Sequence, residues 1–159
     1  MNKNSSIVNE EPKPIDLIRT WEESGYSIGF TNGCFDIIHP GHISLLHCAK
    51  NECDKLVVGL NSDSSVAKLK GKDRPIQKEN ARATVLLALK DVDIVIIFNE
   101  ETPIKLIELI KPDVLIKGGD YKIDEIVGAE FIQQNGGRVV LSDYKNGHST
   151  SDIIKKIES

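Results

Sequence analysis

Residues 30–50 read FTNGCFDIIHPGHISLLHCAK, and this stretch decides the fold. A β-prone apolar run leads to a Pro-Gly break, and His39 and His42 stand on either side of that break. Pro40 suits the first turn of a helix, because its missing N–H would have no intrahelical partner there. Gly41 lets the chain or a ligand come close without a Cβ in the way. The stretch therefore predicts a strand, a tight turn and a helix start that carries two imidazoles.

Strand and helix patterns alternate along the rest of the chain. Short continuous apolar runs are typical of strands buried in a parallel sheet, and they predict strands at 27–32, 55–61, 92–98, 113–119 and 138–143. Helical spacing of apolar residues predicts helices at 15–23, 42–52, 62–70, 78–90, 101–111, 125–137 and 149–159. The alternation predicts an α/β fold: one Rossmann-like domain with a parallel sheet of about five strands and helices on both faces.

The chain of 159 residues has the length of one domain with a single core. Residues 1–12 are predicted to be a flexible lead-in that ends in the stretch PKP, and residues 13–159 to be the domain. The sequence shows no internal repeat and no linker to a second domain. Ligands of open α/β sheets bind beyond the carboxyl ends of the strands, so we expect the site just past the first strand.

Composition narrows the possible partners and compartment. The net charge of −4 gives no reason to expect a nucleic acid or an anionic membrane as partner. Apolar runs are too short to cross a bilayer, and the first residues lack a signal-peptide core, so a cytoplasmic location is expected. Three cysteines in a chain without a secretion signal favour reduced thiols.

Two histidines at a helix start suit an anionic ligand. A helix N-terminus offers free N–H groups and partial positive charge, and residues three apart lie on one helical face. His39 and His42 can therefore converge on one phosphate. A zinc site is the alternative, since the same region holds Cys34, His39, His42, His47, Cys48 and Cys53. Their spacing matches no common zinc motif, and the chain contains neither GxGxxG nor a GxxxxGK[ST] P-loop.

Several blocks of the sequence resemble a known family. NGCFDIIHPGH is similar to the HxGH signature of the nucleotidylyltransferase superfamily, in its cytidylyltransferase-like branch. With it, VGLNSDSSVAKLKGKDRPI, VDIVIIF, DVLIKGGDY and STSDIIKKI resemble the D-glycero-β-D-manno-heptose 1-phosphate adenylyltransferase domain. The resemblance runs in order over about residues 26–158.

This resemblance implies a reaction and its partners. AMP would pass from ATP to D-glycero-β-D-manno-heptose 1-phosphate, giving ADP-heptose and pyrophosphate, with Mg²⁺ on the phosphates. The small molecules ATP and a sugar 1-phosphate are the implied substrates, and a homo-oligomer, a dimer or larger, is the implied state. The sugar kinase that acts upstream in that family would be a separate chain or a separate part of a longer protein.

The resemblance also implies site residues, one position at a time. His39, His42 and Lys72 are the implied catalytic residues. The implied nucleotide-binding residues are Thr31, Asn32, Gly33, Cys34, Lys70, Arg74, Lys117, Gly118, Gly119, Asp120, Ser149 and Thr150. No residue is assigned as a metal ligand. The sequence departs from the family's usual residues at Cys34, His148 and Ser151.

Plainer interpretations remain open for several of these residues. The basic loop at 70–74 is also read as a solvated charge run, residues 117–120 as a turn, and STSD as a helix N-cap. Asp36 is expected to be a structural hydrogen-bond partner, and Arg82 a surface arginine. Other functions that fit are a CTP:glycerol-3-phosphate or GTP:heptose-1-phosphate enzyme, a catalytically silent nucleotide-binding module, and a flavodoxin-like electron carrier.

Overall fold

The computed structural model describes residues 13–119, 121–143 and 149–159. Its strands are β1 (Ile28–Gly33), β2 (Lys55–Asn61), β3 (Ile94–Phe98), β4 (Val114–Gly118) and β5 (Arg138–Ser142). Its helices are α1 (Pro14–Glu23), α2 (Pro40–Asn51), α3 (Asp63–Lys70), α4 (Glu79–Ala88), α5 (Ile104–Ile110), the 3₁₀ turn η1 (Ile123–Glu125), α6 (Ala129–Gln134) and α7 (Thr150–Glu158). These elements fall close to the predicted ranges.

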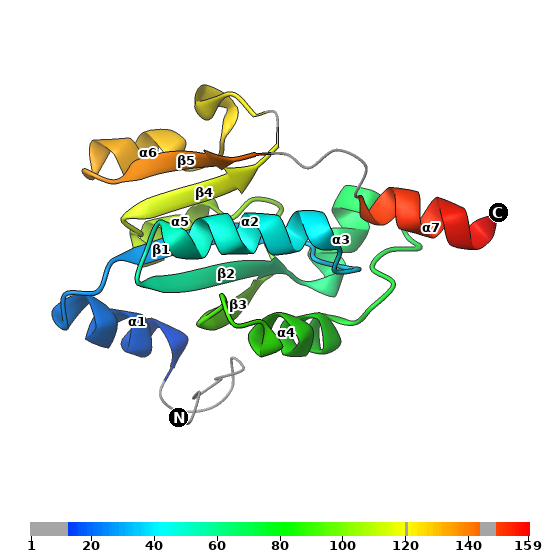
Figure 1. Ribbon diagram of the computed structural model, residues 1–159, viewed down its shortest axis with the longest axis horizontal. Coiled ribbons are helices and arrows are strands. Elements are labelled where there is room, and N and C mark those ends of the chain that lie inside the picture. The colour runs from blue at the N-terminus through cyan, green and yellow to red at the C-terminus, as the bar shows by residue number, and fades with distance from the viewer. Residues whose placement is uncertain (1–12, 120, 144–148) are drawn as a thin grey trace.

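The strands form one parallel sheet in the order β3-β2-β1-β4-β5 (Figure 1). β2 and β3 follow β1 in order on one side of it, whereas β4 and β5 lie on the other side. The direction of winding therefore reverses between β1 and β4, where open α/β sheets leave a crevice at the strands' carboxyl ends. The opening stretch follows β1 directly and lies at this switch point.

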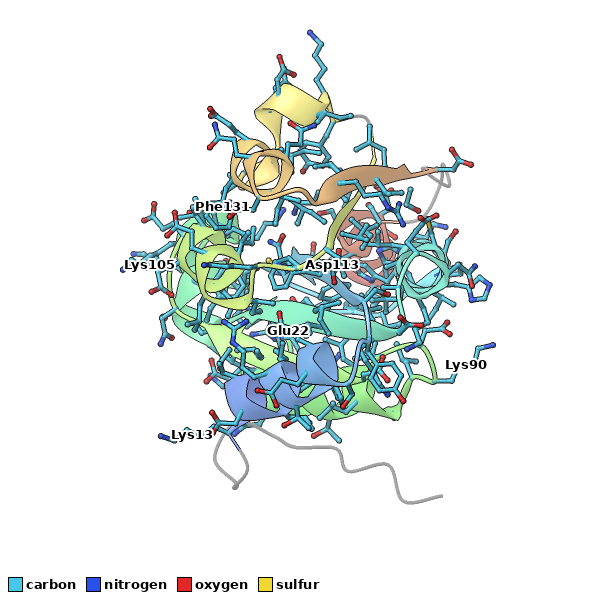
Figure 2. All side chains as sticks on the ribbon, turned by 90° about the vertical axis from the view of Figure 1, so that its left-hand side faces the viewer. Lys13, Glu22, Lys90, Lys105, Asp113 and Phe131 are labelled. Atoms are coloured by element: carbon cyan, nitrogen blue, oxygen red, sulfur yellow. The ribbon has the colours of Figure 1, made fainter. Side chains whose placement is uncertain are left out.

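Apolar side chains cover both faces of the sheet. On one face Ile18, Ile107, Ile110, Ala129 and Ile132 of α1, α5 and α6 pack against Phe30, Val57, Ile94 and Leu115. On the other face Leu46, Ala49, Ala83 and Leu86 of α2 and α4 pack against Leu56, Val58, Val95 and Ile116. Figure 2 shows α5 and α6 on one side of the sheet and α2 on the other. The prediction of a five-stranded parallel sheet covered on both faces is confirmed.

One predicted helix is shorter than the sequence pattern indicates. Residues 125–137 were expected to form one helix, but α6 covers only Ala129–Gln134 and follows the separate turn η1. The chain leaves helical geometry at Ile126, which is extended, and Gly128 before α6 has a left-handed φ of +87° that cannot continue a helix. A Cβ at this position would also lie 2.7 Å from Cδ1 of Ile107 on α5. The helix therefore restarts after the glycine.

The predicted boundary between lead-in and domain lies partly outside the described residues, since residues 1–12 are not among them. Within the described ranges no helix has the length and apolar character needed to span a membrane.

Candidate active site

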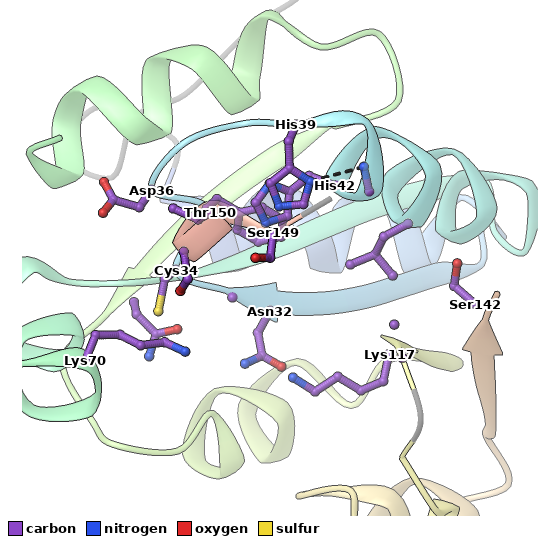
Figure 3. Close-up of a pocket in the computed structure, with 18 of the residues that line it drawn as sticks. Asn32, Cys34, Asp36, His39, His42, Lys70, Lys117, Ser142, Ser149 and Thr150 are labelled. Carbon is purple, nitrogen blue, oxygen red and sulfur yellow. Dashed lines mark hydrogen bonds between the residues drawn. The ribbon is translucent and has the colours of Figure 1, made fainter. Parts of the chain in front are cut away.

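A pocket of about 590 Å³ opens at the carboxyl edge of the sheet, at the switch point (Figure 3). Its walls come from the ends of β1, β4 and β5, the starts of α2 and α7, and the end of α3. The lining residues are Asn32, Gly33, Cys34, Phe35, Asp36, His39, Gly41, His42, Leu45, Asn61, Leu69, Lys70, Arg74, Lys117, Gly118, Gly119, Tyr121, Ser142, Asp143, Ser149, Thr150 and Ser151. This volume lies in the range of small-molecule sites.

A tight turn after β1 brings the opening stretch into the pocket. Phe35 has a φ of +45°, a left-handed conformation that residues with a Cβ seldom adopt. Its ring is buried and lies over Gly33, where a Cβ would approach Phe35 Cε2 to 3.1 Å. The glycine therefore makes room for the ring, and the anchored ring holds the turn that leads into α2.

His39 caps helix α2. Its backbone is extended, and its Nδ1 accepts a hydrogen bond of 3.1 Å from the main-chain N–H of Gly41, the dashed line in Figure 3. An Nδ1 that accepts this bond leaves the proton of a neutral imidazole on Nε2. His39 thus combines a structural role with an N–H donor of defined position. The sequence pattern indicated the donor but not the cap.

His42 lies against His39 and Phe35 and is largely buried. The two imidazole rings stack with their centroids 3.8 Å apart, and the Phe35 ring is tilted against His42 at 5.0 Å. Its buried Nδ1 has no hydrogen-bond partner of good geometry among the described residues. Burial, followed by repulsion from His39, lowers the pKa of His42 to about 4, and the Ile37 main chain opposes this shift only in part. His42 is therefore neutral at physiological pH in the ligand-free protein.

The lowered pKa of His42 predicts a pH-dependent stability. The unfolded chain binds a proton near the ordinary value of 6.5, whereas the folded chain binds it only near 4. Stability is therefore lost as pH falls from about 6.5 toward about 4. His42→Gln, which cannot titrate, is expected to lose less stability than the wild type between pH 7 and pH 5, by on the order of 1 kcal/mol. Urea unfolding of both proteins at the two pH values measures this difference. Equal losses would show that His42 is accessible to protons in the folded chain.

Asp36 fastens the basic loop to the turn after β1. Its carboxylate is buried and accepts hydrogen bonds from Arg74 Nε at 2.9 Å, Ile76 N at 2.8 Å and Gln77 N at 2.9 Å. Burial alone would raise the pKa of Asp36, but the hydrogen bonds from Gln77, Ile76 and Arg74 outweigh it and hold the pKa below its usual value. The expectation of a structural role for Asp36 is confirmed.

Arg82 is the largest departure from the sequence-based expectation. It was predicted to be a surface arginine, but only 1% of its surface is exposed. Its guanidinium donates to the carbonyl oxygens of Cys34 at 2.7 Å, Asn61 at 2.8 Å and Gln77 at 2.9 Å. It also pairs with the Asp63 carboxylate at 2.9 Å. Arg82 thereby joins the ends of β1 and β2 to the segment that follows the basic loop, and the prediction of a surface position was wrong.

The basic residues of the loop occupy different surroundings. Lys70, at the end of α3, lines the pocket. Arg74 also lines it, but its charge is already paired with Asp36. Lys72 is exposed and does not line the pocket in this conformation. The structure thus brings two of the three predicted cations to the site, one of them neutralised.

The end of β4 supplies a further cation and two glycines. Lys117, Gly118 and Gly119 all line the pocket, as the predicted set requires. Burial lowers the pKa of the Lys117 amine. Asp120 lies outside the described residues.

Helix α7 begins at the rim of the pocket. Ser149 is its N-cap and accepts a 3.1 Å hydrogen bond from Asp152 N, which confirms the capping interpretation. Thr150 Oγ1 donates to the Ile37 carbonyl at 3.3 Å and ties this helix start to the segment before His39. Two helix N-termini, those of α2 and α7, therefore meet at one pocket, a favourable arrangement for an anion of several charges.

The remaining residues to place are Thr31, the cysteines and two lining residues that the sequence did not indicate. Thr31 is buried within β1, its hydroxyl has no partner among the described residues, and it does not line the pocket. Burial raises the pKa of the Cys34 thiol. The three cysteines are free, and within the described ranges no group of three His, Cys, Asp or Glu side chains could hold a metal ion. Leu45 and Tyr121 line the pocket without a signal in the sequence.

Comparison with known proteins agrees with the fold and shows the family. A family model described as cytidylyltransferase-like matches residues 30–156. The "Bifunctional protein HldE" of Paramagnetospirillum magneticum is 56% identical over 142 residues, which cover 89% of this chain and 29% of that protein. The protein of the same name from a Bradyrhizobium species is 51% identical over 153 residues, which cover 96% of this chain and 31% of that protein. The chain thus spans less than a third of the length of these relatives.

Two solved structures are similar as well. The lipopolysaccharide core biosynthesis protein of Thermoplasma volcanium is 34% identical with a TM-score of 0.61, over 76% of this chain and 98% of that one. Pantoate-beta-alanine ligase of Francisella tularensis, 16% identical with a TM-score of 0.57 over 91% of this chain and 75% of that one, shares the fold alone.

The sheet order, the pocket at the switch point and the two helix starts around it define a Rossmann-like domain with a ligand-sized pocket at its switch point. Within that class, the chain belongs to the cytidylyltransferase-like family of nucleotidyltransferases, as the resemblance of its sequence blocks predicted.

Proposed function

We propose that the chain transfers AMP from ATP to D-glycero-β-D-manno-heptose 1-phosphate and releases pyrophosphate, with ADP-heptose as product. The observation that carries the proposal is the convergence of His39, His42 and the starts of α2 and α7 on one pocket. Family membership supports nucleotidyl transfer. The sequence blocks that resemble the heptose enzyme, and a relative described as a lipopolysaccharide core biosynthesis protein, support a sugar phosphate as the second substrate.

The chemistry asks for positioning and charge stabilisation rather than for a base. A phosphate oxygen of the sugar phosphate forms a bond to the α-phosphorus of ATP, and the bond from that phosphorus to the bridging oxygen breaks. The attacking oxygen is already anionic near neutral pH, so no proton must be removed. N–H groups of His39 and His42, with the free amides at the two helix starts, would stabilise the charge that moves onto the leaving pyrophosphate.

Mg²⁺ fits this site as an ion that arrives with the triphosphate. Asp36 lines the pocket, but Arg74 and two main-chain amides already bind its carboxylate. The other carboxylate among the described lining residues is that of Asp143, which is exposed. Mg²⁺ commonly keeps several waters and is held by substrate phosphates with one or two carboxylates. When bound it would offset phosphate charge, with Asp143 as its available protein carboxylate.

The proposal also concerns the location, the oligomeric state and the metabolic partner of the enzyme. It includes a cytoplasmic location and a homo-oligomer of two or more copies. It also includes a sugar kinase that supplies the heptose 1-phosphate. This kinase would be a separate chain, or a separate part of a longer protein, as the unmatched length of the relatives allows.

The test is a coupled pyrophosphate-release assay with purified protein and Mg²⁺. ATP, CTP, GTP and UTP are each offered with heptose 1-phosphate or glycerol 3-phosphate. Release with ATP and heptose 1-phosphate alone is the expected result. Release with another pair would keep nucleotidyl transfer and change the substrate, and silence with every pair would favour a binding module that lacks catalysis.

Lys72 provides a separate prediction about the basic loop. If the loop closes over the phosphates only during reaction, Lys72→Ala lowers kcat by about tenfold or more, equivalent to about 1.4 kcal/mol, and changes the KM for ATP little. Lys68→Ala, at an exposed position of α3, is the matched control and should leave both constants unchanged. Steady-state kinetics with varied ATP separates the two constants. An unchanged kcat in Lys72→Ala would make the loop a solvated surface.

A further inference from the structure

Asn32 and Lys117 lie side by side on neighbouring strands. β1 and β4 pair in parallel with Phe30 opposite Leu115, where the pairing ends, and the same register continued by two residues on each strand puts Asn32 level with Lys117. Because side chains alternate along a strand, Asn32 shares the face of Phe30, and Lys117 the face of Leu115. That face is the one covered by α5 and α6, not the one from which α2 presents its histidines.

The two side chains point toward one another across the pocket floor. Figure 3 shows the amide of Asn32 and the amino group of Lys117 approaching each other on one side of β1, with His39 and His42 on the other side. Both residues line the pocket, and Lys117 is largely buried. The pocket thus has two polar walls, one on each side of the sheet edge.

Neither Asn32 Oδ1 nor Lys117 Nζ has a hydrogen-bond or ion-pair partner within the described part of the chain. The buried Oδ1 of Asn32 accepts no hydrogen bond there. Lys117 forms no ion pair with a described carboxylate, and its Nζ lies 5.9 Å from the centroid of the Tyr121 ring. Buried polar groups in native proteins are nearly always paired. The unpaired buried oxygen of Asn32, beside a lysine that has no ion pair, therefore indicates a ligand that brings a hydroxyl group and an anion together.

The geometry of phosphoryl transfer separates two subsites. Attack on the α-phosphorus is in line, so the attacking oxygen and the leaving pyrophosphate lie on opposite sides of that atom. The histidines and the helix starts suit the pyrophosphate side. The acceptor phosphate then belongs on the opposite side, where Asn32 and Lys117 stand.

We propose that Lys117 and Asn32 form the subsite for the acceptor substrate, a sugar 1-phosphate. Lys117 Nζ donates to the acceptor's phosphate, and Asn32 Oδ1 accepts a hydrogen bond from a hydroxyl of the same sugar. The inference rests on the proposed function and deepens it, because it moves these two residues from the nucleotide to the second substrate. Burial of the Lys117 amine fits this role, since a phosphate would restore the stabilisation that water no longer supplies.

The experiment measures KM for both substrates in the full chain. Lys117→Met is expected to raise the KM for heptose 1-phosphate about tenfold or more and the KM for ATP less than about threefold. Lys117→Arg, which keeps the charge, should recover much of the loss. Asn32→Ala should raise the same KM by a smaller factor. Lys90→Met removes an exposed lysine between α4 and β3 and is the control for net charge. A rise in the KM for ATP in place of that for the sugar phosphate would overturn the assignment.

A binding measurement keeps the inference separate from the proposed reaction. Heptose 1-phosphate is titrated calorimetrically into protein saturated with α,β-methylene-ATP and Mg²⁺, which needs no turnover. Wild-type binding that Lys117→Met loses and Lys90→Met retains would support the subsite even if no pyrophosphate is ever released. Equal binding by wild type and Lys117→Met, or no binding by wild type, would overturn it. Circular dichroism establishes that each variant is folded.

Discussion

His42→Ala is expected to lower kcat by about 10²- to 10³-fold, the usual loss when one well-placed donor to a developing anion is removed. The ring is held by His39 on one side and Phe35 on the other, so its position is set before a ligand arrives. Its pKa of about 4 makes it a neutral donor in the free protein, and a bound triphosphate would favour the charged form. The loss should fall mainly on kcat, because the charge that His42 meets grows in the transition state.

Two companion variants make the result specific. His42→Gln keeps an N–H donor of similar reach and should retain part of the activity that His42→Ala loses. His47→Ala removes an exposed histidine of the same helix, which faces Asp91 rather than the pocket, and should be neutral. Steady-state kinetics of pyrophosphate release measures all three. Near-normal turnover in His42→Ala, with the protein folded, would remove the histidine from the mechanism.

The architecture was predictable because its signals are local. Continuous apolar runs such as that of Lys55–Asn61 differ clearly from the helical spacing of 78–90, and their alternation admits few sheet topologies. The start of α7 was also predictable, since Ser149 caps it as the STSD pattern indicated. The break at Gly128 was missed because a glycine within a helical pattern is often tolerated, and the close approach of Ile107 that requires it is a tertiary contact.

The site was predictable where functional residues cluster at the end of one strand. Asn32 and Gly33 end β1, His39 follows in the turn before α2, and all three line the pocket. The different surroundings of the three basic residues in the loop were not predictable. They depend on which cation pairs with Asp36, a residue more than thirty positions away in the sequence. The pairing of Asn32 with Lys117 was likewise hidden, since it depends on the order of strands in the sheet.

Arg82 was misjudged because arginine is seldom fully buried, and a helix of mixed composition suggests a solvated face. A signal was present. Arg82 lies four residues before Leu86, so both occupy one stripe of α4, and that stripe faces the core. A charged residue on an apolar stripe requires partners that only the folded chain supplies, here three carbonyl oxygens and the Asp63 carboxylate.

Arg82→Met is expected to lower the free energy of unfolding by about 3–5 kcal/mol, the usual effect of removing one partner of a buried ion pair. Methionine fills a similar volume but leaves the carbonyl oxygens of Cys34 and Asn61 without donors. Each unpaired buried acceptor costs about 1–3 kcal/mol. The remaining folded protein should also lose activity, because Cys34 and Asn61 both line the pocket.

Urea unfolding of matched variants tests this role. Arg138→Met removes an exposed arginine that pairs with Glu52 at 2.6 Å, and should cost less than about 1 kcal/mol. Arg82→Lys keeps the charge but not the planar fork of donors, so it should fall between wild type and Arg82→Met. This milder variant keeps the test measurable if Arg82→Met does not fold. If Arg82→Lys and Arg82→Met were as stable as Arg138→Met, the contacts of Arg82 would hold no part of the fold, and the order of the site would have to come from Asp36 and its loop alone.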